Sequence, residues 1–127
     1  MEEVTHGTDA PLPLTPAVFH ILLALAGGER HGYAIMREVA SMTSGALKLG
    51  PGTLYRSIKS LLAAGLIEET EERPDPALDD ERRRYYRLTE LGERMAQAEA
   101  ARLERLVGVA RARRLLPGAA PALGGAR

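Results

Sequence analysis

The sequence predicts a small α+β domain that is mainly helical and is followed by one long helix. Apolar residues recur at helical spacing in four segments, and two short β-favouring segments lie between the third and the fourth. Gly and Pro mark the ends of most segments. The 127 residues suffice for one domain with its own core and one appended element. We expect the domain at residues 14–89, the long helix at 90–115, a flexible arm at 1–13 and a disordered tail at 116–127.

Caps and apolar stripes predict the first two helices. Thr15 followed by Pro16 is typical of a helix start, because Thr can accept from a free amide and Pro has none to satisfy. The first helix ends at Gly27, and a second runs from about residue 32 to residue 42. The alternating residues 47–49 are interpreted as a minimal strand.

A third helix and a hairpin follow. The helix opens at residues 50–53, and Gly65 is well placed as the left-handed residue after its end. The strands of the hairpin are expected at residues 66–72 and 83–88, joined by a long loop rich in Asp and Pro. Successive strand residues point to opposite faces, so one of the two tyrosines at positions 85 and 86 should enter the core.

Thr89 is the predicted cap of the last helix, which should run to about Leu115. Its apolar stripe is longer than the preceding domain can cover, and an uncovered stripe needs a partner. We therefore expect the helix to pack against a second copy of the chain, the alternative being a helix folded back onto its own domain. The predicted dimerisation residues are Met95, Ala96, Ala100, Leu103, Leu106, Val107 and Ala110.

Composition narrows the function. The chain has no Cys, which excludes disulfides, thiolate zinc sites and a cysteine nucleophile. No His and carboxylate cluster, nucleophile–base pair or Gly-rich phosphate loop stands out, so we expect no metal, no cofactor and no enzymatic activity. Neither a membrane span nor a signal peptide is recognisable, and a cytoplasmic protein is expected. The net charge is zero, but residues 29–65 carry five Lys and Arg against two Asp and Glu.

Four short motifs resemble the PadR family of bacterial transcriptional regulators. They are HGYAI at residues 31–35, LGPGTLY at 49–55, GLI at 65–67 and RYYRLTELG at 84–92. The resemblance covers about residues 14–95 and is closest to the smaller members with a single C-terminal helix. It implies a winged helix-turn-helix fold with a C-terminal dimerisation helix. It also implies a homodimer that binds double-stranded DNA and acts as a repressor on a pseudo-palindromic operator.

The chain departs from the family pattern in three places. Arg56 stands where the family often has Pro, and Arg84 stands for its Lys. The tip of the wing, residues 74–81, carries four acidic residues and would repel phosphate, so the basic base of the wing is the better candidate for DNA contact.

The third helix supplies the leading candidates for DNA contact. Apolar residues define one side of its helical wheel, and small or polar residues with one Arg define the other. Arg56 and Thr53 are expected at bases or phosphates, Lys48 and Lys59 at phosphates, and the hydroxyls of Tyr33 and Tyr55 at phosphates. Tyr55 could instead be partly buried. The full set is Tyr33, Lys48, Gly52, Thr53, Tyr55, Arg56, Lys59, Ser60, Arg82, Arg83 and Arg84.

Two other functions stay open. A winged helix can serve as a protein-interaction module, and the neutral net charge favours that alternative. An enzyme on the same fold would need a polar pocket, which the sequence does not indicate. A small-molecule effector remains unknown; one sandwiched between tryptophans is not supported, because the chain has no Trp.

Overall fold

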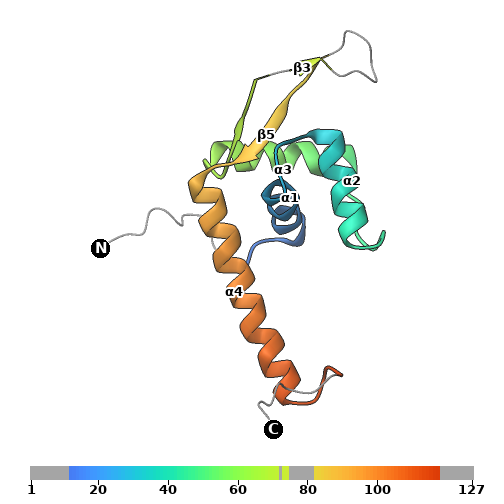
Figure 1. Ribbon diagram of the computed structural model, residues 1–127, viewed down its shortest axis with the longest axis vertical. Helices are drawn as coiled ribbons and strands as arrows, with labels where there is room; N and C mark the ends of the chain where they lie inside the picture. The colour runs from blue at the N-terminus through green and yellow to red at the C-terminus, as the bar shows by residue number, and fades with distance from the viewer. Residues whose placement is uncertain (1–11, 72, 75–81, 118–127) are drawn as a thin grey trace, which may run out of the picture.

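The computed structural model describes residues 12–71, 73–74 and 82–117 (Figure 1). Within them, a small antiparallel sheet lies at one end of a body of three helices, and the last helix extends away from this body at the other end. This is the winged helix-turn-helix fold. The elements are α1 Pro16–Ala26, β1 Arg30–His31, α2 Gly32–Met42, α3 Pro51–Ala63, β2 Ile67–Glu69, β3 Arg73–Pro74, β4 Arg82–Arg83, β5 Tyr85–Leu88 and α4 Glu90–Ala112. The predicted arm and tail lie outside the described residues, except for residues 12–13 and 116–117.

Side-chain caps begin three of the helices, as the sequence predicts for two of them. The Thr15 hydroxyl accepts from the amide of Val18 at 3.2 Å, and the Thr89 hydroxyl accepts from that of Gly92 at 3.0 Å. His31 caps α2 through Nδ1, which accepts from the amide of Ala34 at 3.1 Å. The cap explains why an imidazole stands directly before this helix.

The sheet has the strand order β1-β5-β2, and the wing continues outward as the pair β3 and β4. The predicted strand at residues 47–49 is wrong. Arg30 and His31 occupy the edge of β5 instead, opposite Tyr86 and Tyr85. No strand among the described residues pairs with residues 47–49: the amide of Leu47 donates to the Thr43 hydroxyl at 3.0 Å, and Leu49 is buried in the core.

The two hairpin strands are each shorter than predicted, because the ladder is interrupted near Thr70 and Arg84. The Thr70 amide donates to the carbonyl of Tyr85 at 2.7 Å, and its hydroxyl donates to the same oxygen at 3.2 Å. This double contact takes up the carbonyl of Tyr85 at the point where β2 ends and β5 begins, beyond which the outer pair of strands lies.

One apolar core joins the helices to the sheet. Tyr86 is the tyrosine that enters it, whereas Tyr85 packs edge-on against the His31 ring with the ring centroids 5.3 Å apart. The buried members are Ile21, Leu22, Ala24, Leu25, Ile35, Val39, Leu49, Leu54, Ile58, Leu61, Leu66, Ile67, Tyr86 and Met95.

The long helix α4 ends at Ala112, earlier than the predicted Leu115. Arg114 adopts a left-handed conformation with φ of 64°, and the amide of Leu115 donates back to the carbonyl of Ala110 at 2.8 Å. This is a Schellman stop, which here forms without glycine. In the described part of the chain, no helix is both long and apolar enough to cross a membrane.

Candidate nucleic-acid interface

The outer face of α3 is free of the domain core. Leu54, Ile58 and Leu61 point into the core and set the rotation of the helix. The opposite face is small and polar: Gly52, Arg56, Lys59 and Ser60 are exposed and Thr53 is half-buried. The helical wheel therefore correctly predicts that these residues lie on the solvent-facing side of α3.

The first turn of α3 can receive an anion. Its cap residue, Gly50, makes no side-chain hydrogen bond, and Pro51 has no amide. The amides of Gly52 and Thr53 have no helical carbonyl to donate to, as in the first turn of any helix, and no side-chain cap takes up either of them. A guanidinium nitrogen of Arg56 lies 3.4 Å from the Thr53 hydroxyl, so the two predicted contact residues are neighbours.

Two tyrosines join this face to the start of α2. Tyr33 and Tyr55 are each 48% exposed. The Tyr55 ring lies against Gly32, where a Cβ would come within 2.9 Å of the ring carbon that bears the hydroxyl. The start of α2 and the N-terminal half of α3 consequently adjoin, and glycine at position 32 is what permits the close approach.

The basic residues divide into paired and unpaired groups, which sequence reasoning missed. Arg84 pairs with Glu69 at 3.3 Å and Arg87 with Glu68 at 2.7 Å, so the acids of β2 neutralise the base of the wing. By contrast, no carboxylate among the described residues lies within 4.0 Å of the charged groups of Arg37, Lys48, Arg56 and Lys59.

This division revises the predicted wing contacts. Arg84 is exposed but already paired, which weakens its claim to a phosphate. The backbones of Arg82 and Arg83 form β4, while their side chains and the acidic tip lie outside the described part of the chain. Arg37 was not among the predicted residues, although it lies one helical turn after Tyr33 and thus on the same face of α2.

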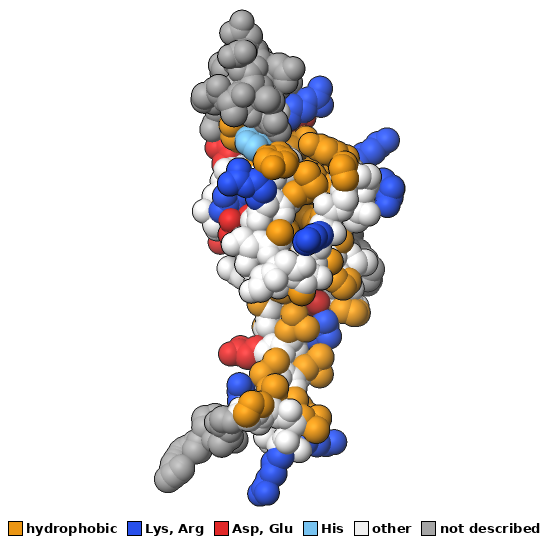
Figure 2. All heavy atoms as spheres, turned by 90° about the vertical axis from the view of Figure 1, so that its right-hand side faces the viewer, with side chains coloured by type: hydrophobic (Ala, Val, Ile, Leu, Met, Phe, Trp, Pro, Cys, Tyr) orange, Lys and Arg blue, Asp and Glu red, His pale blue; other side chains and the backbone are white. Residues whose placement is uncertain are grey.

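The predicted dimerisation stripe has two halves. Met95 is only 1% exposed and belongs to the domain core with Ala96 packed beside it, so Met95 cannot contribute to a surface. Further along, Leu106 is 53% exposed, and Figure 2 shows hydrophobic side chains gathered along this projecting part of α4. Val107 and Ala100 are exposed as well, and Leu103 and Ala110 are half-buried.

A buried ion pair marks the junction between α4 and the body. Glu99 is 2% exposed, and both its oxygens accept from Arg102 at 2.8 Å. This bidentate contact, together with a hydrogen bond from the Leu14 amide, lowers the pKa of the Glu99 carboxyl. The hydrogen bond from Leu14 therefore ties the start of the domain to the long helix, while Arg102 neutralises Glu99 from within α4.

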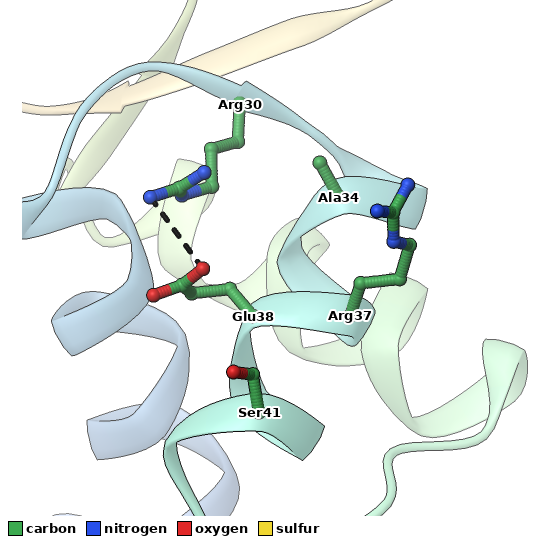
Figure 3. Close-up of a pocket in the computed structure, with 5 residues that line it drawn as sticks. All are labelled: Arg30, Ala34, Arg37, Glu38 and Ser41. Carbon is green, nitrogen blue, oxygen red and sulfur yellow. Dashed lines mark ion pairs between the residues drawn. The ribbon is translucent and has the colours of Figure 1, made fainter.

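No cluster of His, Cys, Asp and Glu among the described residues could hold a metal ion, and open pockets lie on either side of the helical body. One pocket, of about 340 Å³, lies beside α2 (Figure 3). Another, of about 220 Å³, is largely apolar and lies between the start of α1 and the end of α3. Burial, with Glu69 nearby, raises the pKa of the Tyr86 phenol.

Comparison with known proteins connects this geometry to a family. The family model described as "Transcriptional regulator PadR-like family" matches residues 21–98. An uncharacterized 37.1 kDa protein in transposon TN4556 of Streptomyces fradiae is 35% identical over 88 residues. These residues are 69% of this chain but 23% of that protein, so the chain spans less than a quarter of its relative.

Solved structures share the fold. A transcriptional regulator from Clostridium thermocellum is 25% identical, with a TM-score of 0.61 over 72% of this chain and 86% of that one. A PadR family transcription regulator from Clostridium difficile is 21% identical, with a TM-score of 0.64 over 76% and 95%. Bacillus subtilis PadR, solved in complex with operator DNA, is 21% identical, with a TM-score of 0.56 over 64% and 44%.

Proposed function

Because the chain belongs to the PadR-like family of transcriptional regulators, we propose that it binds duplex DNA through the outer face of α3. The observation that carries this proposal is where the Lys and Arg side chains with and without carboxylate partners lie. The body's Lys and Arg side chains that have no carboxylate partner among the described residues lie on α2, on α3 and on the loop before α3, whereas the described arginines of β1 and β5 have such partners. A surface that keeps its cations free can release counterions from DNA phosphates.

The shape of α3 suits the major groove. The groove admits one helix, and small outward residues such as Gly52 and Ser60 let the helix backbone approach the base edges. Arg56 projects from the middle of this face, where a guanidinium can donate two hydrogen bonds to a guanine edge. Lys48 and Lys59 lie before and along the helix and suit the flanking phosphates. We assign Arg56 to base recognition and the two lysines to positioning.

The chain acts as a homodimer in this proposal. Leu106 and Val107 are too exposed to be left in water on a helix that projects from the body, and a second copy of the same helix would cover them. Two-fold symmetry would then present two copies of α3 to the same side of a duplex, one helical turn or roughly 34 Å apart. Such a dimer reads a pseudo-palindrome. Occupation of an operator by the dimer would repress transcription, and we expect no cofactor to be required.

Selection of bound fragments from the host genome tests this proposal. We expect enriched fragments to contain an inverted repeat whose half-site centres lie about 10 base pairs apart. The selection should be repeated with Arg56→Ala, which removes the assigned base contact. The proposal fails if no fragment is enriched over bulk DNA.

A protein-interaction module is the second candidate. The ion pairs of Arg84 and Arg87 favour it, because they leave the base of the wing with little net charge. It predicts that the purified protein ignores duplex DNA at all salt concentrations, so the same selection separates the two functions.

A further inference from the structure

Arg37 is held over the ring of Tyr33 on the exposed side of α2. Its guanidinium carbon lies 5.7 Å from the ring centroid, which is within the range of a cation–π contact. The two residues are four positions apart and therefore share one face of the helix. Tyr33 is 48% exposed and Arg37 is exposed as well, so the pair faces solvent rather than the core.

The charge of Arg37 is not neutralised by its neighbours. The acid closest to it on the same helix, Glu38, pairs with Arg30 at 3.7 Å on the other side of the pocket. Figure 3 shows the Arg37 side chain pointing away from that pair. In the part of the chain that the structure describes, Arg37 has the Tyr33 ring as its partner and no carboxylate within 4.0 Å.

The Tyr33–Arg37 pair adjoins the proposed DNA-binding face. Tyr55, from the second turn of α3, packs against Gly32 at the start of α2. Tyr33 is the next residue, so the pair extends the surface of α3 sideways along α2. In helix-turn-helix complexes the helix that precedes the recognition helix crosses the sugar–phosphate backbone. In this chain that helix is α2.

We propose that Arg37 contacts a DNA phosphate and that the Tyr33 ring is the positioning residue that directs it there. The inference rests on the proposed function and deepens it: it adds a sequence-independent contact and changes the role of Tyr33 from a hydroxyl donor to a ring support. A guanidinium fixed in direction loses less rotational freedom when it binds, and its planar fork matches the oxygens of a phosphate. The contact adds affinity to every sequence and does not discriminate between bases.

Four single variants, one double variant and a matched control test the pair. Binding of a labelled random-sequence duplex is measured by anisotropy as salt is raised, and binding of a selected operator is measured in parallel. Arg37→Gln should weaken both by a similar factor and should lower the slope of log affinity against log salt by about one. Arg37→Lys, which keeps the charge, should recover the slope. Arg105→Gln removes an equal charge from the exposed far part of α4 and should change the slope less.

The Tyr33 variants separate the ring from the hydroxyl. Tyr33→Leu should lower the affinity for DNA, but by less than Arg37→Gln does. The double variant should bind DNA as Arg37→Gln alone does, because the ring acts only through Arg37. Tyr33→Phe, which keeps the ring, should retain most of what Tyr33→Leu loses. An equal loss in Tyr33→Phe and Tyr33→Leu would overturn the positioning role.

The inference and the proposed function fail differently. If Arg37→Gln keeps the parental affinity and salt slope while the parent binds DNA, the inference is overturned and the proposed function stands. If the parent does not bind duplex DNA even at low salt, both are overturned.

Discussion

Gly92 lies directly against the carbonyl group of Leu66. A Cβ on residue 92 would come within 2.9 Å of the Leu66 carbonyl carbon and closer still to its oxygen. The same oxygen accepts from the amide of Thr89 at 3.1 Å, and the Thr89 hydroxyl donates to the carbonyl of Gly65 at 2.6 Å. The start of α4 is thereby fixed to the end of α3, so the direction of the long helix follows from the position of the helix proposed to bind DNA.

Gly92→Ala should destabilise the protein. The new methyl group would meet backbone that cannot move aside without shifting β2, and such overpacking costs about 1–3 kcal/mol. Gly108→Ala is the matched control on the same helix, because a Cβ there meets nothing within 4 Å. It should stabilise the helix by up to about 1 kcal/mol. Urea denaturation checks both, and equal signs for the two variants would contradict the close approach.

Arg56→Ala should weaken binding to a selected operator by about 1–3 kcal/mol and relax the preference at one base pair. Lys59→Gln should weaken binding to all sequences alike, because a phosphate contact carries no sequence information. Competition of operator variants for the purified protein distinguishes the two effects. A uniform loss across all base substitutions in the Arg56 variant would remove this residue from base recognition.

Leu106→Glu should yield monomers. The side chain is 53% exposed in the single chain, so the fold does not need it, and a buried unpaired carboxylate would oppose packing of one α4 on another. Light scattering should report half the parental mass. Ala101→Glu is the control, because Ala101 is exposed on the opposite side of the helix. A dimeric mass for Leu106→Glu would place the interface elsewhere.

The Glu99 carboxylate should make the free energy of unfolding depend on pH in the acidic range. Its pKa is lowered in the folded protein, first by the hydrogen bonds from Arg102, so the stabilisation is present above the ordinary value of 4.5. It is lost as the pH falls from 4.5 through the lower folded value. Urea midpoints measured across this range should fall less steeply for Glu99→Gln and for Arg102→Gln than for the parent. Parallel profiles for all three proteins would exclude the ion pair as the source.

Features of the fold that depend on residues close together in the chain could be predicted from the sequence. Thr15, Thr89 and Gly65 act through neighbours a few positions away, so the caps and the left-handed φ of 77° at Gly65 could be predicted from the chain alone. The outer face of α3 could be predicted for the same reason, because the core residues Leu54 and Ile58 fix the helix rotation.

Contacts between distant segments could not be predicted in this way. The strand β1 has only two residues, and its pairing depends on where the edge of β5 lies in space. The pairing of Arg87 with Glu68 depends on strand register, which places these two residues opposite each other. One signal was present in the sequence: Glu99 falls on the apolar side of the last helix, where a charge requires a partner.

The salt dependence of duplex DNA binding tests the central claim most directly, since it measures whether the free cations of α3 and its preceding loop meet phosphates. The parent should bind tightly at about 50 mM salt and lose affinity steeply by about 200 mM. Lys48→Gln with Lys59→Gln should lower the slope by about two, and the control pair Arg105→Gln with Arg111→Gln should lower it less. Binding that is absent, independent of salt, or equally reduced in slope by both pairs would contradict a DNA interface on α3.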